Sequence, residues 1–313
     1  MTYLERAIEL AERGRGTTRP NPVVGAVVVS DGTVIGEGWH ERKGGPHAEV
    51  VALEAAGGRA RGSTLYVTME PCAHHGTTPP CTDAVQRAGV SKVVAGSLDP
   101  NPKARGGLDV LAAAGLEVEH ADCFEARRQN EAWRTWAATG RPFVTLKLAV
   151  TLDGRVTVPG ARWVTGEESR RRVHELRAAS DVVAVGMGTV RADHPRLDAR
   201  DVTVERQPRR IAFGRGPLPE GSGLELLSGP LEDELHRLGE HDVQSLLLEG
   251  GPTLATAFLE RDLVDRLLLF VAPTIAGEGQ RLLGALPGTV ELRRLRAEPV
   301  GDDVLLDAYV HEP

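Results

Sequence analysis

Along the first 140 residues, segments with the apolar spacing of a helix alternate with short apolar segments typical of strands. The earliest set has the spacing of one helix face and consists of Leu4, Ala7, Ile8 and Ala11. Thr2 and Glu5 form a capping-box pattern at its start. Later segments with the short apolar runs of strands are 23–29, 33–39, 64–69, 92–97 and 116–120, and amphipathic segments typical of helices are 47–56, 79–88, 108–114 and 123–138. This alternation predicts a layered α/β sheet.

The helical pattern ends at Thr139-Gly140-Arg141-Pro142, and a new apolar strand begins at Phe143. We expect a domain boundary there, with domains at residues 1–140 and 141–313. The second part again mixes strands, predicted at 143–150, 181–185, 210–213, 245–248, 265–271 and 304–310, with helices, predicted at 167–178 and 253–260. Residues 214–229 are rich in Gly and Pro and predict a loop. Both domains are therefore expected to be α/β.

The composition of the chain argues against several classes of protein. The 313 residues carry a net charge of −7, which argues against a protein that coats nucleic acid through phosphate contacts. Three cysteines form no disulfide framework, and no apolar run approaches the ~18 residues of a membrane span. The first helix carries acidic residues, unlike a targeting segment. We expect a soluble cytoplasmic protein that binds neither nucleic acid nor a membrane.

The sharpest chemical feature of the sequence is a set of metal-binding residue types. His47 and Glu49 open a predicted helix, and Cys72 and Cys81 follow at later element ends. One imidazole and two thiolates suit Zn²⁺ and leave a fourth position for water, whose pKa zinc lowers to about 7. Glu49 could carry the proton of that water. The H-x-E and P-C pattern is typical of the zinc nucleobase deaminases.

Two other interpretations of these residues remain open from the chemistry alone. His47, Cys72 and Cys81 could be a satisfied histidine and apolar buried thiols. Alternatively, the site could hold a structural zinc with His74 or His75 as its fourth ligand. Glu49 distinguishes the cases, because a structural site has no use for a carboxylate aimed at an open ligand position.

The second part of the chain holds two glycine-rich turns that follow predicted strands. Gly186-Met187-Gly188-Thr189 follows one, and residues 249–253 (EGGPT) follow another and open a helix. Exposed amides at a helix start bind phosphate, and glycine lets the phosphate approach. Such turns are equally common as packing devices, so the turns alone leave nucleotide binding open.

The loop PCAHHGTTPPC (71–81) points to a family, because eight residues separate its cysteines where C-x-x-C is usual. Together with TTRPNPVVGAVVV before it, DPNP (99–102) after it, and the later runs TGRPFVTLKLAVTLDGR and LLLEGGPTL, it resembles the bifunctional riboflavin-biosynthesis deaminase/reductases over essentially the whole chain. The resemblance implies a cytidine-deaminase-like three-layer α/β/α domain at 1–140, the zinc-dependent pyrimidine deaminase. It implies a dihydrofolate-reductase-like α/β domain at 141–313, the NADPH-dependent reductase.

The same resemblance implies an activity and its site residues. The substrate would be 2,5-diamino-6-(5-phosphoribosylamino)pyrimidin-4(3H)-one, deaminated first and then reduced by NADPH from ribosyl to ribityl. In the first domain His47, Cys72 and Cys81 would hold one zinc per chain, Glu49 would be the proton shuttle, and Asn21 and His40 would line the pyrimidine pocket.

For the second domain, the resemblance implies the substrate positions Lys147, Arg177, Leu197, Arg200 and Glu249. Its cofactor positions are Ala149, Trp163, Thr189, Asp193, Gly251, Pro252, Thr253, Leu254, Ala255, Thr256 and Ala257. We further expect a homo-oligomer, either a dimer or a tetramer.

Several positions depart from the family pattern. Thr77 stands where Lys or Arg usually meets the substrate, so that either another basic residue, Lys103 or Arg105, takes this role or the substrate is bound more weakly. Ala161 and Gly214 replace serines that contact substrate and cofactor, and the segment 155–163 is about two residues short. Two rival functions remain open from the sequence. One is a zinc deaminase of another pyrimidine, or of tRNA adenosine, with a vestigial second domain. The other is a structural-zinc protein whose second domain only senses a nucleotide.

Overall fold

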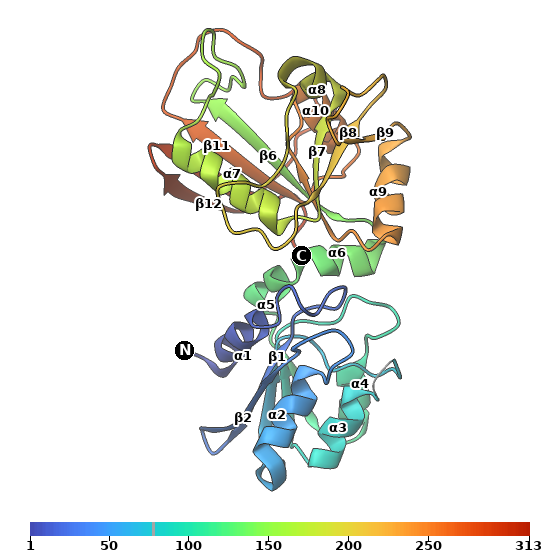
Figure 1. Cartoon of the computed structure of the whole chain (residues 1–313). Helices are drawn as coiled ribbons and strands as arrows, with labels where there is room; N and C mark the ends of the chain where they lie inside the picture. Colours follow the sequence, from blue (N-terminus) through green and yellow to red (C-terminus); the bar gives the residue numbers. More distant parts are fainter. Residues whose placement is uncertain (77–78) are drawn as a thin grey trace. The chain divides into compact units, whose positions relative to one another are not determined.

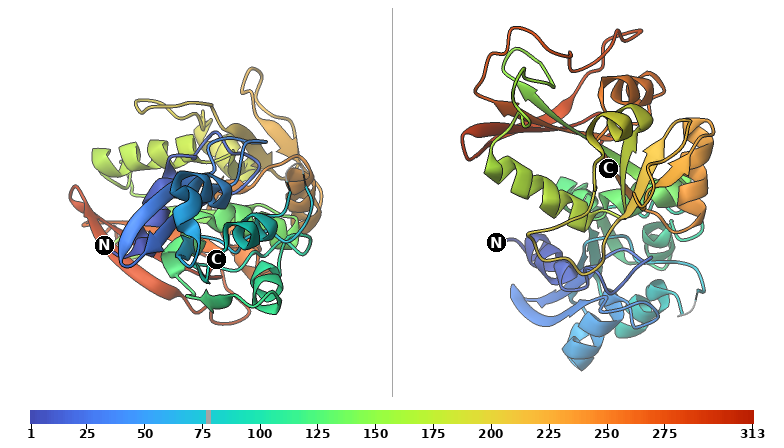
Figure 2. Two further views of the ribbon diagram at one scale, coloured as in Figure 1. Left: turned by 90° about the horizontal axis from the view of Figure 1, so that it is seen from below. Right: turned by 45° about the horizontal axis from the view of Figure 1, so that its top comes forward.

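The structure, a computed structural model, describes residues 1–76 and 79–313. It divides into two compact units, an N-terminal unit of Met1–Thr139 with Pro313 and a C-terminal unit of Gly140–Glu312 (Figures 1 and 2). Each unit has its own sheet and hydrophobic core. No described helix is long and apolar enough to cross a membrane. Thr77 lies outside the described residues.

The N-terminal unit is built on a five-stranded sheet in the order β2-β1-β3-β4-β5. Its strands are β1 (Gly25–Ser30), β2 (Thr33–Trp39), β3 (Thr64–Val67), β4 (Lys92–Ala95) and β5 (Glu117–His120). β1 is antiparallel to β2 and β3, whereas β3, β4 and β5 are parallel. The parallel strands end at the same edge of the sheet, and the loops that leave them there supply site residues.

Helices cover both faces of this sheet because the side chains of β1 alternate between two cores. Val27 and Val29 pack on α1 (Tyr3–Glu12), and Ala26 and Val28 belong to the core on the opposite face. That second face carries α2 (Ala48–Ala56), a 3-10 turn (Gly57–Ala60), α3 (Cys81–Ala88) and α4 (Gly107–Ala113). The expected three-layer α/β/α fold is confirmed.

The capping box of the first helix is present, because the Thr2 hydroxyl accepts from the Glu5 amide and the Glu5 carboxylate accepts from the Thr2 amide. Its buried residues differ slightly from the expectation. Ala7, Leu10 and Ala11 are buried, whereas Leu4 and Ile8 are only partly covered.

The long helix expected at 123–138 is wrong as a single element, because it breaks at Asn130 into α5 (Phe124–Gln129) and α6 (Glu131–Thr139). The buried Asn130 side chain accepts from the Val23 amide at 2.9 Å and donates to the Val23 carbonyl at 2.8 Å. The side-chain amide of Asn130 thus satisfies both backbone hydrogen-bonding groups of Val23, in the segment that leads into β1. This pairing is long-range, so the local helical pattern gave no sign of the break.

The C-terminal unit contains an eight-stranded mixed sheet in the order β12-β13-β11-β6-β10-β7-β8-β9. The strands are β6 (Phe143–Thr151), β7 (Val182–Gly186), β8 (Arg209–Phe213), β9 (Glu225–Leu227), β10 (Ser245–Leu248), β11 (Arg266–Ala272), β12 (Arg293–Val300) and β13 (Asp303–Tyr309). The strands from β11 to β9 are parallel, and β13 and β12 are antiparallel to their neighbours. The expected α/β class is confirmed in this unit too.

The helices of this unit are α7 (Glu167–Ala179), α8 (Met187–Asp193), α9 (Leu231–Glu240) and α10 (Pro252–Glu260). The helices α8 and α9 and the strands β9 and β12 were not expected from the sequence. β9 has three residues inside a Gly/Pro-rich loop, and β12 is exposed on both faces, so neither has the alternation that marks a half-buried strand. In contrast, α9 carries a helical apolar stripe at Leu231, Leu235 and Leu238 that could have revealed it.

Candidate active sites in the two units

Three metal-binding side chains meet at one edge of the N-terminal sheet. His47 is the N-cap of α2, Cys72 follows β3, and Cys81 is the first residue of α3. His47 Nδ1 lies 3.2 Å from Cys81 Sγ and 3.7 Å from Cys72 Sγ, and the ligand atoms all lie within 4.8 Å of one another. One nitrogen and two sulfur donors at this spacing fit a tetrahedral zinc with one open position.

A buried carboxylate stands beside this group. Glu49 occupies the first turn of α2, two residues after His47, and is only 3% exposed. Burial raises the pKa of Glu49 to about 7, and the positive charge of His47 opposes that effect. A carboxyl group that exchanges a proton near neutral pH is suited to general acid–base transfer.

Asn21 and His40 lie together beside the metal-binding group, although they come from distant segments of the chain. Asn21 Nδ2 lies 3.3 Å from His40 Nε2, and the His40 ring packs edge-on against the ring of His47 with centroids 5.3 Å apart. Burial lowers the pKa of His40, which favours the neutral ring. His40 Nδ1 lies 2.9 Å from the Pro46 carbonyl, so Nδ1 carries the proton and Nε2 accepts from Asn21.

His74 and His75 do not join the metal group. Both are exposed, and within residues 1–76 and 79–313 the group of close metal-binding side chains consists of His47, Cys72 and Cys81. A structural zinc with one of these histidines as its fourth ligand is therefore not what the structure shows.

Glu70 supports the site, although sequence analysis gave it no role. Its buried carboxylate accepts from the backbone amides of Asp99, Gly106 and Leu108 at 3.0–3.2 Å. The loop 99–108 is thereby held against the turn that carries Cys72. A side chain at Gly107 would place its Cβ 1.7 Å from the Pro71 carbonyl oxygen, so this approach requires glycine. The sequence signal for this role was an acidic residue, Glu70, directly before Pro71-Cys72.

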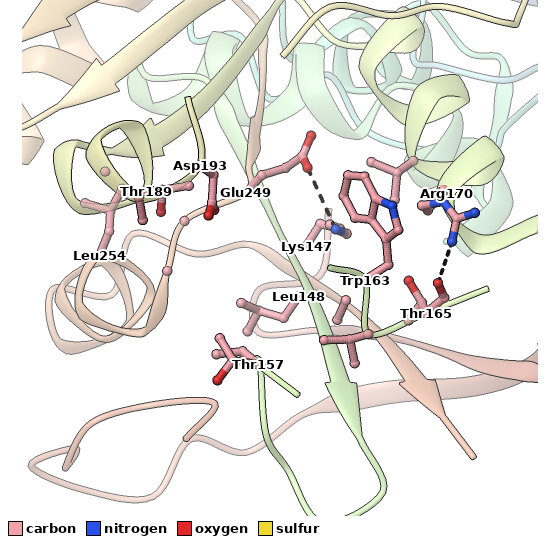
Figure 3. Close-up of a pocket in the computed structure, with 18 of the residues that line it drawn as sticks. Lys147, Leu148, Thr157, Trp163, Thr165, Arg170, Thr189, Asp193, Glu249 and Leu254 are labelled. Carbon is pink, nitrogen blue, oxygen red and sulfur yellow. Dashed lines mark hydrogen bonds and ion pairs between the residues drawn. The ribbon is translucent and has the colours of Figure 1, made fainter. Parts of the chain in front are cut away.

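The C-terminal unit contains a cavity of about 1270 Å³ at the carboxyl ends of β6, β10, β7 and β8 (Figure 3). It exceeds the ~300–1,000 Å³ common for one small ligand, so a cofactor and a substrate fit together. Expected site residues that line it are Lys147, Ala149, Trp163, Arg177, Thr189, Asp193, Arg200, Glu249, Gly251, Pro252, Thr253, Leu254 and Ala257.

Three expected residues are not among the described lining residues. Leu197 is 2% exposed and packs in the core beside Met187. Ala255 and Thr256 lie on the inner side of α10, where Thr256 Oγ1 accepts from the Gly284 amide at 2.8 Å. One helix cannot turn every residue of a seven-residue run toward a single ligand, because its side chains point around the whole circumference.

A buried ion triad lies in this cavity. Arg177 binds Glu249 through two hydrogen bonds of 2.6 and 3.0 Å, and Lys147 Nζ lies 3.8 Å from Glu249 Oε2. Burial lowers the pKa of Lys147, and Glu249 opposes that effect. Burial alone would raise the pKa of Glu249, but Lys147 and Arg177 outweigh it and the pKa is lowered. The carboxylate therefore stays ionised and orients both cations.

Arg200 and His174 complete the same end of the cavity. Arg200 Nη1 donates to Asp198 Oδ1 at 2.8 Å, and His174 Nδ1 lies 3.2 Å from the Asp198 carbonyl. His174 was not expected at the site from the sequence. Its signal was the spacing to Arg177, because residues three apart on a helix share a face. Trp163 also lines the cavity, and the guanidinium groups of Arg162 and Arg170 lie 5.0 and 5.6 Å from the centre of its ring, which belongs to a residue that is 53% exposed.

Comparisons with known proteins agree with this geometry. The RibD C-terminal domain family matches residues 142–306, and the cytidine and deoxycytidylate deaminase zinc-binding region matches residues 1–97. Riboflavin biosynthesis protein RibD of Aquifex aeolicus is 40% identical and covers 97% of this chain and 96% of its own; that of Escherichia coli is 40% identical and covers 93% and 92%.

Solved structures extend the similarity to the fold. Acinetobacter baumannii RibD matches with a TM-score of 0.84 and 37% identity, over 98% of this chain and 97% of its own. A Thermotoga maritima protein, described as a diaminohydroxyphosphoribosylaminopyrimidine deaminase/5-amino-6-(5-phosphoribosylamino)uracil reductase, matches with a TM-score of 0.81 and 35% identity over the same shares. The chain belongs to the RibD family of riboflavin-biosynthesis proteins and combines a zinc-binding deaminase region with a reductase domain.

Proposed function

We propose that this chain acts on 2,5-diamino-6-(5-phosphoribosylamino)pyrimidin-4(3H)-one, deaminating it in the N-terminal unit and reducing the product in the C-terminal unit with NADPH. The observation that carries the proposal is the buried Glu49 beside the open group of His47, Cys72 and Cys81. The description of the Thermotoga maritima relative supplies the substrate class. A deaminase with a vestigial second domain is not favoured, because the charged side chains Lys147, Arg177 and Glu249 line the C-terminal cavity.

In the deaminase step, His47, Cys72 and Cys81 would hold zinc, which would supply a water molecule activated for attack near neutral pH. Glu49 would take the proton that this water gives up and pass it to the exocyclic amine, which leaves as ammonia while the water oxygen stays on the ring carbon. Asn21 and the neutral His40 hold the pyrimidine edge through hydrogen bonds.

The substrate phosphate needs a cation that Thr77 does not provide. Lys103 and Arg105 are exposed on the loop that Glu70 anchors beside Cys72. We infer that one of these residues binds the phosphate in the deaminase site, because guanidinium and ammonium groups form charge-assisted hydrogen bonds with phosphate oxygens.

In the reductase step, NADPH supplies a hydride and the protein orients the reacting groups. Ala149, Trp163, Thr189, Asp193 and the turn 251–254 line the cofactor's part of the cavity. Lys147 lies where an ammonium group can donate to the ribose oxygen, held by Glu249. Arg177 and Arg200 stand on the substrate side, where Arg200 has the freer guanidinium.

Incubation of the purified protein with the diaminopyrimidine substrate tests this function. Without NADPH, we expect release of ammonia and a product in which oxygen replaces the amino group. With NADPH, that product gains two hydrogen atoms, which mass spectrometry detects. Glu49→Gln is expected to retain zinc and lose ammonia release, whereas full activity of this variant would refute the assigned role of Glu49.

A further inference from the structure

His174 lines the C-terminal cavity from α7, three residues before Arg177. Residues three apart share one face of a helix, so the two side chains enter the cavity together. His174 Nδ1 lies 3.2 Å from the Asp198 carbonyl oxygen, which also accepts from Arg177 Nη1 at 3.1 Å. Because a carbonyl oxygen can only accept, Nδ1 carries the ring proton, and the lone pair of the neutral ring lies on Nε2.

The surroundings of His174 favour the neutral ring and direct Nε2 into the cavity. Burial lowers the pKa of His174, and the charges of Arg177 and Arg200 lower it further, whereas the Asp198 carbonyl and Glu249 oppose the effect. Asp198 is not among the described lining residues of the cavity, although His174 is. The Nδ1 side of the ring therefore faces away from the cavity, and the Nε2 side faces into it.

Nε2 of His174 is an acceptor that no protein donor occupies. Within the described ranges 1–76 and 79–313, the hydrogen bond of this side chain is the one that Nδ1 makes to Asp198. The charged neighbours do not duplicate its chemistry, because Arg177 and Arg200 can only donate. Both oxygens of Glu249 already accept from Arg177. A ligand at this end of the cavity therefore meets cationic donors together with a free neutral acceptor.

We propose that His174 Nε2 accepts a hydrogen bond from a hydroxyl group of the ribosyl chain and so selects a sugar phosphate over a bare phosphate. The inference rests on the proposed reductase function, in which Arg177 and Arg200 stand on the substrate side. Guanidinium groups bind phosphate oxygens through charge-assisted hydrogen bonds. Those oxygens have no proton for Nε2, whereas a sugar hydroxyl group both donates and accepts. The arginines thus bind the anion, and His174 recognises the sugar.

Calorimetric titration of the full chain saturated with NADP⁺ tests the site without turnover, because the oxidised cofactor has no hydride to give. The two ligands are 5-amino-6-(5-phosphoribosylamino)uracil and inorganic phosphate. His174→Ala should weaken binding of the sugar phosphate roughly three- to tenfold, as expected for one hydrogen bond, and leave binding of inorganic phosphate unchanged. His174→Gln should keep most of the affinity, since its amide oxygen can take the place of Nε2. The shorter side chain of His174→Asn reaches only Asp198, so this variant should behave like His174→Ala.

His236→Ala is the matched control and should bind both ligands normally. His236 lies on α9 with Nδ1 2.8 Å from the Glu232 carbonyl, but it is exposed and is not among the described lining residues of the cavity. Unchanged sugar-phosphate affinity in His174→Ala, equal losses for both ligands, or an intact His174→Asn beside an impaired His174→Gln would overturn the inference. The proposed reductase function fails in a distinguishable way, namely if the unaltered protein oxidises no NADPH in the presence of the sugar phosphate.

Discussion

At the scale of single residues, each candidate role depends on what surrounds the side chain. Cys72 and Cys81 share a metal-binding group with His47, whereas Cys123 lies outside it and is 3.7 Å from the Glu125 carboxylate. Likewise, Arg196 and Arg200 both bind the Asp198 carboxylate, but only Arg200 is among the described lining residues of the cavity. Such pairs provide internal controls.

Replacing Cys81 with Ser should remove zinc, because two remaining ligands cannot hold the ion in a three-ligand site. Metal analysis of the purified variant should give far less than one zinc per chain. Cys123→Ser should keep one zinc per chain. Loss of zinc from Cys123→Ser, or its retention in Cys81→Ser, would show that the ligand set is wrong.

Arg200→Ala should raise the KM for the phosphorylated sugar substrate roughly ten- to hundredfold through loss of charge-assisted hydrogen bonds. Affinity for NADPH should hardly change. Steady-state reduction at saturating NADPH measures the effect, with Arg196→Ala as the control that loses the other bond to Asp198. An unchanged KM in Arg200→Ala would remove this residue from the substrate site.

At the scale of elements, one buried ion pair joins the start of β6 to the start of β11. Arg141 donates to both oxygens of Asp265 at 2.7 and 2.8 Å, and Asp265 also accepts from the Val144 amide at 2.7 Å. Burial would raise the pKa of Asp265, but the hydrogen bonds from Arg141 and His311 outweigh it and lower the pKa below 3.8. The pair therefore positions the strand that carries Lys147.

Because the folded-state pKa of Asp265 is depressed, its contribution to stability is full above the unfolded pKa of about 4 and is lost as the pH falls through the folded pKa. Asp265→Asn should lower the free energy of unfolding of the C-terminal unit at pH 7 by about 3–5 kcal/mol, since the largely buried Arg141 loses its carboxylate partner. The variant should also lose less stability on acidification.

Pulsed hydrogen exchange of the β6 and β11 peptides along a urea series measures this change within the C-terminal unit. Asp262→Asn is the control, because Asp262 is 78% exposed and forms an ion pair with His311 without a hydrogen bond to the Arg141–Asp265 pair. If Asp265→Asn unfolds at the same urea concentration as Asp262→Asn, the buried pair does not stabilise the β6–β11 junction.

At the scale of the whole molecule, each unit contains its own core and its own candidate site. The metal group and Glu49 come from residues 47–81, and the lining residues of the cavity come from residues 147–280. Neither set of described residues includes a side chain from the other unit. The two reactions are therefore expected to respond separately to substitution.

Cys72→Ser should abolish deamination but leave NADPH-dependent reduction of pre-deaminated substrate intact. Lys147→Met should do the reverse, because it removes the ammonium of the triad and leaves the zinc ligands untouched. Ammonia release, NADPH oxidation and zinc content measured on both variants provide the comparison. Parallel loss of both activities in either folded variant would contradict two independent sites.

Short-range sequence patterns determined most elements and the chemistry of the metal site. Val27 and Val29 alternate with Ala26 and Val28, so both faces of β1 could be recognised as buried from the sequence alone. His47, Glu49, Cys72 and Cys81 each stand at a predicted element end, where the topology of a parallel sheet brings loops together. Local periodicity and residue chemistry are sufficient for such features because they depend on neighbours along the chain.

Tertiary structure alone decided the remaining features, because they depend on contacts between distant residues. Asn130 breaks a helix by pairing with Val23, 107 positions away. Glu249 orients Lys147 and Arg177 from the end of β10, the strand next to β6, and Leu197 turns into the core rather than toward the cavity. No local pattern encodes these contacts, since each joins residues from separate segments of the chain.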